Sequence, residues 1–80
     1  MSDQQPLRVL ITGAASGLGA ALARAWEDRG ADVLRTDRAP ADGILTLDIT
    51  SDADWAAARE HVEQTWGGLD VLVKIGRAHV

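Results

Sequence analysis

The feature that most constrains the fold is a loop of glycine and other small residues, residues 13–19, between an apolar run and a helical pattern. Residues 7–12 are mostly aliphatic or β-branched and end at Gly13, which predicts a short strand. After the loop, apolar residues recur at helical spacing: Leu18, Leu22, Ala25 and Trp26. Gly30 follows Arg29, a combination typical of a helix end. The first elements are therefore predicted to be a strand, a tight loop and an amphipathic helix.

The following residues continue the alternation of strand and helix. Strands are predicted at residues 32–36, 44–47 and 69–73, and a second helix at residues 51–66. At the start of that helix Ser51 and Asp54 have the spacing of a capping box. Its predicted apolar stripe consists of Trp55, Ala58, Val62 and Trp66.

This order of elements predicts an α/β fold. Strands separated by helices favour a parallel sheet with right-handed crossovers. Only residues 38–43 connect the second and third strands, although parallel neighbours usually need about a dozen connecting residues or more. We expect a short loop crossover there rather than a hairpin. The predicted architecture is the N-terminal half of a doubly wound (Rossmann) parallel sheet, strand order 3-2-1-4, truncated relative to the whole fold.

Length and composition restrict the class of protein. The 80 residues suffice for one small domain, residues 7–73, preceded by a flexible tail at residues 1–6. The net charge is −4 and the basic residues are scattered, so nucleic acid is not an expected partner. Cysteine is absent, which excludes disulfides and thiolate metal sites, and no metal site is predicted. Without a recognisable signal peptide or an apolar run near the roughly 20 residues of a membrane span, we expect a cytoplasmic protein outside the membrane.

The loop has the composition of an anion site. Backbone amides at the start of a helix point outward without partners, and the helix dipole favours negative charge there. Glycine lets a pyrophosphate approach these amides, and the Ser16 hydroxyl can donate to a phosphate or a ribose. A nucleoside-triphosphate loop requires a lysine directly after its glycines, and this chain has none there. The dinucleotide-binding pattern Gly-x-Gly-x-x-Gly is not met either, because Gly17-Leu18-Gly19 is not followed by a glycine at the required place. The alternative is that the glycines only permit a tight turn and close helix packing.

Residues 12–19 follow the pattern Thr-Gly-x-x-x-Gly-x-Gly. This pattern resembles the short-chain dehydrogenase/reductase family. In the extended branch of that family the second glycine comes one residue earlier, where this chain has Ser16, so the compact branch is the better match. The resemblance covers residues 7–73 and implies an oxidoreductase that interconverts an alcohol and a carbonyl with NAD or NADP.

Asp37 stands at the end of the second predicted strand, directly after residue 36 and 18 residues after Gly19. A carboxylate at this place can accept hydrogen bonds from both hydroxyls of the adenosine ribose and repel a 2′-phosphate, which favours NAD over NADP. The neighbouring Arg38 leaves NADP open, because a guanidinium can clamp a 2′-phosphate or stack on adenine. In the absence of a cofactor site, Asp37 and Arg38 would be a solvated turn pair.

Asp48 and Ile49 stand at the end of the third predicted strand, directly after residue 47. The pair resembles the family's Asp-Val/Ile pair at the adenine pocket. The resemblance implies that the Asp48 carboxylate accepts from the adenine amino group and that Ile49 lines the ring. The alternative is that Asp48 competes with Ser51 as the cap of the second helix. The complete set of predicted cofactor-binding residues is Thr12, Gly13, Ser16, Gly17, Leu18, Gly19, Asp37, Arg38, Asp48 and Ile49.

After residue 73 the chain departs from the family pattern. The family usually continues Asn-Asn-Ala-Gly, whereas residues 74–80 read Lys-Ile-Gly-Arg-Ala-His-Val, and we expect this segment to be a non-native tail. The family's serine and Tyr-x-x-x-Lys pair have no counterpart, and the chain contains no tyrosine. No catalytic residue is therefore assigned, and the chain is expected to be an inactive cofactor-binding fragment. The resemblance implies that the intact enzyme binds a small-molecule substrate and forms a homo-oligomer; the alternative is a non-catalytic dinucleotide-binding module.

Overall fold

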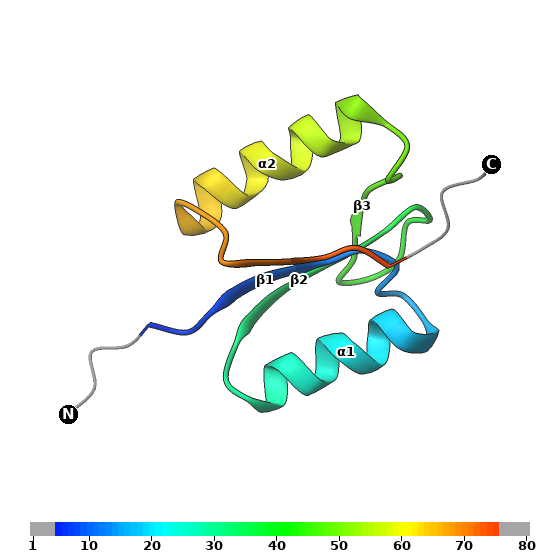
Figure 1. Cartoon of the computed structure of the whole chain (residues 1–80). Helices are drawn as coiled ribbons and strands as arrows, with labels where there is room; N and C mark the ends of the chain where they lie inside the picture. The colour runs from blue at the N-terminus through cyan, green and yellow to red at the C-terminus, as the bar shows by residue number, and fades with distance from the viewer. Residues whose placement is uncertain (1–4, 76–80) are drawn as a thin grey trace.

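The computed structural model describes residues 5–75. Its elements are β1 (Arg8–Ile11), α1 (Gly17–Asp28), β2 (Asp32–Asp37), β3 (Leu45–Thr46), α2 (Asp52–Trp66) and β4 (Val71–Val73). The strand pairs are parallel and the order across the sheet is β3-β2-β1-β4, which confirms the predicted α/β class, parallel sheet and 3-2-1-4 order (Figure 1). Most of the tail predicted at residues 1–6, and residues 76–80 of the segment expected to be non-native, lie outside the described range.

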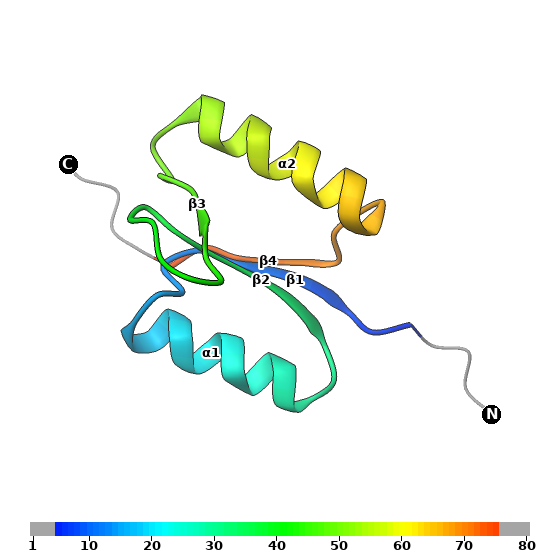
Figure 2. The ribbon, with the colours of Figure 1, turned by 180° about the vertical axis from the view of Figure 1, so that it is seen from behind.

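The two helices cover opposite faces of the sheet (Figure 1 and Figure 2). β1 lies inside the sheet, and its side chains alternate between the faces. Val9 and Ile11 pack in a cluster with Ala23 of α1, whereas Leu10 packs in a cluster with Val62 of α2. All three β1 side chains are at most 3% exposed. An apolar strand buried on both faces is typical of parallel α/β sheets.

The buried face of α1 differs from the predicted stripe. The residues that meet the sheet are Gly19, Leu22, Ala23 and Trp26. The prediction that Leu18 and Ala25 share this face is wrong, because Leu18 is 65% exposed and Ala25 is also exposed. A Cβ atom on Gly19 would lie only 2.0 Å from Gly13 O, so α1 can approach the loop this closely only without a side chain at that position. The helix is therefore turned so that Gly19 and Ala23 are buried, with Leu22 and Trp26 half-buried beside them.

The connection from β2 to β3 is a short loop crossover, as predicted. β3 pairs in parallel with the end of β2 alone, Thr36 with Leu45 and Asp37 with Thr46. The connection does not have to return along the whole strand, and this is why so few residues suffice. Beyond β3, Leu47 N donates to Asp37 O at 2.7 Å and extends the contact between the two segments.

The ends of α2 agree with the sequence signals. Ser51 is the N-cap, and its Oγ accepts a hydrogen bond from Asp54 N at 3.1 Å. Gly67 follows the helix with a φ of 77°, in the left-handed region that favours glycine. The predicted stripe faces the sheet, with Ala58 and Val62 buried and Trp55 and Trp66 half-buried.

An ion pair joins the start of β1 to the turn between α2 and β4. Arg8 Nε and Nη2 donate to the two oxygens of Asp70 at 3.0 and 3.2 Å, and Arg8 Nη1 donates to Trp66 O at 2.8 Å. The backbone Arg8 N also donates to Asp70 Oδ2, at 2.8 Å. These charge-assisted bonds, above all the side-chain hydrogen bond from Arg8, hold the pKa of Asp70 below its usual range.

Acid is expected to weaken the fold through Asp70. A carboxyl group whose pKa is lowered by folding stabilises the fold above its ordinary pKa of 3.8, and this contribution is lost as the pH falls through the folded value. Urea unfolding at about pH 7 and about pH 3 should therefore show a smaller acid-induced loss for Asp70→Asn than for the wild-type chain. Asp42→Asn, which changes an exposed carboxylate in the β2–β3 loop, should lose as much as the wild type. Equal losses in all three proteins would contradict this prediction.

Candidate functional site

The predicted site residues gather at one edge of the sheet, where β1, β2 and β3 end. The glycine-rich loop leaves β1, Asp37 is the last residue of β2, and Asp48 follows β3. Because the strands are parallel, their carboxyl ends lie at the same edge (Figure 1). In open α/β sheets this edge is where ligands bind. The structure thus brings the three predicted groups of residues together.

Thr12 lies beneath the loop. It is 0% exposed, and its hydroxyl donates to Ile75 O and accepts from Ile75 N, both at 2.7 Å. Thr12 N donates to Val73 O at 3.0 Å. These bonds join the end of β1 to the end of β4. Thr12 therefore supports the loop from below, with its hydroxyl already paired within the protein.

The loop is also bonded to the end of β2. Ala14 N donates to Thr36 O at 2.8 Å, and Ala15 N donates to Asp37 Oδ2 at 3.0 Å. Asp37 Oδ1 accepts from Arg38 N at 2.7 Å. An ionised carboxylate has about four acceptor positions, so positions remain for the hydroxyl groups of a ligand. In the structure Asp37 orders the loop, a role that its place at the strand end does not reveal.

The three glycines of the loop have different surroundings. Gly13 and Gly17 both lie in the left-handed region, with φ values of +63° and +60°. A Cβ on Gly13 would lie 3.0 Å from Ile75 O, and one on Gly19 would lie 2.0 Å from Gly13 O. By contrast, no atom of the described chain lies within 4 Å of a Cβ built on Gly17. Close packing accounts for Gly13 and Gly19, whereas the side of Gly17 is open.

At the N-terminus of α1, next to this opening, the N–H groups of Gly17, Leu18 and Gly19 have no hydrogen-bond partner among residues 5–75. Ser16 is the N-cap, but its side chain makes no capping hydrogen bond and is exposed. The first turn of α1 contains no acidic residue. The outward amides and the helix dipole therefore attract an anion without a competing carboxylate from that turn. Leu18, which does not belong to the core, lies exposed in the same turn.

Asp48 begins a tight turn between β3 and α2. Its Oδ1 accepts from Thr50 N at 2.9 Å and from Thr50 Oγ1 at 2.7 Å. These bonds, with a smaller contribution from the charge of Arg38, hold the pKa of Asp48 below its usual range. Both bonds go to Oδ1, so within residues 5–75 Oδ2 stays available to a ligand. The alternative in which Asp48 caps α2 is not observed, because Ser51 makes that bond.

Three further residues contribute to the site, although no sequence pattern assigns them to it. Trp55 Nε1 donates to Ile49 O at 2.9 Å, and Asp54 Oδ2 accepts from Asp48 N at 2.8 Å. Trp55 lies on an apolar stripe, which indicates core packing, and Asp54 has capping-box spacing, so neither pattern points to the site. Ala15 contributes only its backbone N–H, and the identity of a side chain does not predict such a contact.

Comparison with known proteins decides the family. A family model described as short chain dehydrogenase matches residues 7–76. The chain belongs to the short-chain dehydrogenase family.

Relatives of this short-chain dehydrogenase chain include two curated enzymes and many solved structures. The chain is 38% identical over 76 residues to galactitol 2-dehydrogenase from Agrobacterium fabrum, covering 80% of the chain and 30% of that protein. It is 35% identical over 74 residues to 3-ketodihydrosphingosine reductase from Bacteroides thetaiotaomicron, covering 86% and 28%. The structure of 3-ketoacyl-(acyl-carrier-protein) reductase from Brucella melitensis, complexed with NADH, matches with a TM-score of 0.72 and 33% identity, covering 82% and 32%. The chain thus spans less than a third of the length of each of these relatives.

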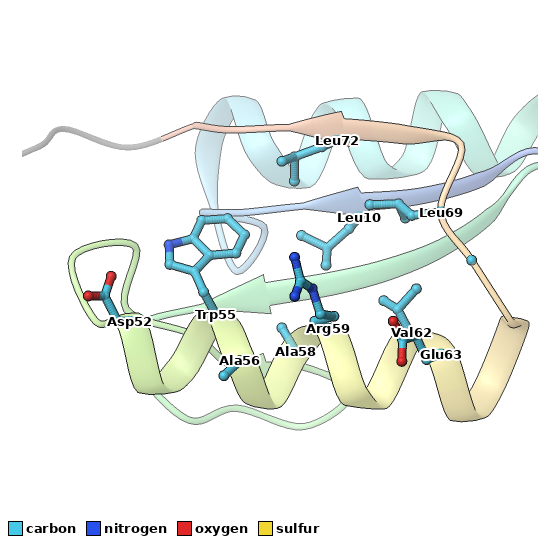
Figure 3. A pocket seen from close by; sticks show the side chains of 11 residues that line it. Leu10, Asp52, Trp55, Ala56, Ala58, Arg59, Val62, Glu63, Leu69 and Leu72 are labelled. Atoms are coloured by element: carbon cyan, nitrogen blue, oxygen red, sulfur yellow. The ribbon is translucent and has the colours of Figure 1, made fainter.

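In this short-chain dehydrogenase, a groove of about 550 Å³ lies between α2 and the side of the sheet formed by β1 and β4 (Figure 3). Trp55 and Arg59 of α2 line it on one side, and Leu10 and Leu72 line it on the sheet side. Leu72 is 46% exposed and Leu69, before β4, is 37% exposed. None of the predicted cofactor-binding residues lines the groove, and Trp55 is the residue that borders both the groove and Ile49 of the candidate site.

Residues 5–75 contain neither a membrane-spanning helix nor a cluster of metal-binding side chains. No helix in this range is long and apolar enough to cross a membrane. The same range holds no group of three or more His, Cys, Asp or Glu side chains placed to hold a metal ion. The candidate site consists of the backbone amides and hydroxyl at the start of α1 and the carboxylates of Asp37 and Asp48.

Proposed function

We propose that this chain binds a nicotinamide dinucleotide, NAD in preference to NADP, at the carboxyl edge of its sheet. The observation that carries the proposal is the open side of Gly17 at the N-terminus of α1. A pyrophosphate at this place would accept hydrogen bonds from the first amides of α1 and from Ser16 Oγ. The exposed Leu18 would contact the same ligand, which accounts for its position outside the core.

The adenosine end of the cofactor is proposed to lie over the ends of β2 and β3. Asp37 would accept from the two ribose hydroxyls while it keeps its bonds to Ala15 N and Arg38 N. Asp48 Oδ2 would accept from the adenine amino group, and Ile49 would line the ring. The charge of Asp37 would repel a 2′-phosphate, and this is the reason for placing NAD before NADP. Arg38 supports NADP as the alternative, because its guanidinium could clamp that phosphate.

The whole protein is proposed to be an oxidoreductase that interconverts an alcohol and a carbonyl. Bound NAD or NADP would supply or accept the hydride, and the residues of this chain would hold and orient the cofactor. The relatives are named as dehydrogenases and reductases, and the chain spans less than a third of each of them. No residue of the chain is assigned to proton transfer, since it contains no tyrosine for the role that the family gives to that side chain.

Sequencing the source DNA beyond codon 73 tests the enzymatic part of this proposal. We expect the reading frame to continue into Asn-Asn-Ala-Gly and later into Tyr-x-x-x-Lys. A frame that encodes residues 74–80 and then a stop codon would contradict the oxidoreductase. It would favour a small cofactor-binding protein without catalysis.

Replacing Asp37 by asparagine should reduce the preference for NAD over NADP. The amide oxygen can still accept from Ala15 N, so the loop stays anchored, but the negative charge that repels a 2′-phosphate is lost. We expect the ratio of the two Kd values, measured by calorimetric titration, to change in favour of NADP by about tenfold.

Asp32→Asn is the matched control for this variant. Asp32 is an exposed carboxylate at the other end of the same strand, β2. Its replacement should leave the ratio of the two Kd values unchanged. The same ratio in Asp37→Asn as in the wild type would contradict the selecting role of Asp37, and no saturable binding of either dinucleotide to the folded wild type would contradict the proposed function itself.

A further inference from the structure

The carboxylate of Asp48 and the indole of Trp55 meet on one peptide group. Trp55 Nε1 donates to the carbonyl oxygen of Ile49 at 2.9 Å. The N–H of the same peptide group belongs to Thr50 and donates to Asp48 Oδ1, also at 2.9 Å. A peptide group is planar and rigid, so the bond at its carbonyl end fixes the direction of its N–H. The indole therefore controls the donor that holds the carboxylate.

The ring of Trp55 is itself held in place. It is half-buried and packs against the cluster formed by Leu10, Leu47, Ala58 and Val62. Figure 3 shows the ring standing between α2 and the sheet, at one end of the groove. A donor fixed by packing can orient its acceptor in a way that a mobile surface side chain cannot.

We propose that Trp55 is a positioning residue for adenine recognition, because it fixes the Ile49–Thr50 peptide group that orients the Asp48 carboxylate. The inference rests on the proposed function, in which Asp48 Oδ2 accepts from the adenine amino group. Without the indole N–H, the Ile49 carbonyl loses its partner, and the peptide group can rotate toward solvent. Asp48 then keeps its charge but loses its fixed direction.

A comparison of NAD with nicotinamide hypoxanthine dinucleotide isolates this effect. The analogue carries an oxo group in place of the adenine amino group, so it cannot donate to Asp48 there. The wild-type chain should prefer NAD by about tenfold or more. In Trp55→Phe, which keeps an aromatic ring but lacks the N–H, this preference should fall by roughly fivefold. A partly unfolded sample weakens both Kd values by the same factor, so their ratio reports recognition and not stability.

Trp66→Phe is the matched control. Trp66 lies on the same helix and packs against the same cluster, but its indole donates no hydrogen bond within residues 5–75. The control should keep the wild-type preference. Equal preferences in Trp55→Phe and Trp66→Phe, or a wild-type chain that binds NAD without preference, would overturn the positioning role and leave dinucleotide binding intact. Absence of binding by the folded wild type would overturn the proposed function, and the positioning role with it.

A measurement on the wild-type chain does not depend on how the variants fold. In ¹⁵N NMR spectra the Trp55 indole N–H signal should shift on saturation with NAD, because the peptide group that accepts from it contacts the adenine subsite. Nicotinamide mononucleotide, which lacks adenine, should leave this signal in place, and the Trp66 indole signal should respond to neither ligand. A Trp55 signal that does not respond to bound NAD would overturn the proposal.

Discussion

Replacing Gly19 by alanine should remove a large part of the stability of this chain. The added Cβ would lie 2.0 Å from Gly13 O and 2.6 Å from Gly13 C, and both are backbone atoms that cannot rotate away. Relief requires α1 to move off the loop, which would pull Ala23 and Trp26 away from the cluster around β1. Overpacking in a well-packed interior usually costs about 1–3 kcal/mol, and a backbone clash is expected at the upper end or beyond. Total stabilities are only about 0.05–0.15 kcal/mol per residue, so this loss is large for a short chain.

Urea unfolding monitored by circular dichroism measures this effect. The control is Gly30→Ala, at the other end of α1. Gly30 has a φ of +89°, but no atom of residues 5–75 lies within 4 Å of an added Cβ, so this change adds only backbone strain, about 1–2 kcal/mol. A Gly19→Ala chain that is as stable as Gly30→Ala would show that the loop and helix can separate without loss, contrary to the close packing of Gly19 against Gly13.

Replacing Gly17 by alanine should, in contrast to Gly19→Ala, have a small effect on the free energy of unfolding and a large effect on the Kd for NAD. Nothing in the described chain lies within 4 Å of the new Cβ, so the expected cost in stability is the strain of a φ near +60°, about 1–2 kcal/mol. The Cβ would, however, occupy the space through which a pyrophosphate is proposed to reach the amides of α1. Loss of these charge-assisted hydrogen bonds should raise the Kd for NAD by about 100-fold or more.

Calorimetric titration with NAD, under conditions where circular dichroism shows a folded variant, tests this prediction. Gly30→Ala is again the matched control, because it carries similar backbone strain far from the proposed site and should bind NAD as the wild type does. Wild-type affinity in Gly17→Ala would mean that this glycine serves only the turn. The proposed pyrophosphate position would then be wrong.

The contrast between these two glycines shows where reasoning from sequence stops. The pattern Thr-Gly-x-x-x-Gly-x-Gly marks Gly17 and Gly19 equally, and it leaves open whether the glycines serve packing or a ligand. The structure separates them, because Gly19 is buried against Gly13 and Gly17 has an open side. Periodicity also assigns Leu18 to the apolar stripe of the first helix, because a hydrophobic pattern gives weight to large side chains. Helix packing here is decided by the small ones, Gly19 and Ala23.

For the candidate site, the sequence likewise predicts which residues lie together but not which hydrogen bonds they make. The strand order predicts that the residues after β1, β2 and β3 share one edge, since parallel strands end together. It does not predict that Asp37 anchors the loop through Ala15 N, or that Trp55 holds the carbonyl of Ile49. In both bonds one partner is a backbone group, and its direction depends on the fold around it.

The sequence by itself determined the order of the elements, the parallel sheet, the cap at Ser51 and the family resemblance. These follow from residues that are neighbours in the chain or recur at a fixed spacing, so local rules suffice to predict them. Only the tertiary structure decided which face of α1 is buried, which glycine leaves open space, and that Thr12 pairs with Ile75 instead of facing outward. The physical reason is that burial and hydrogen bonding depend on distances between segments remote in sequence, and on backbone N–H and C=O directions that no side chain reveals.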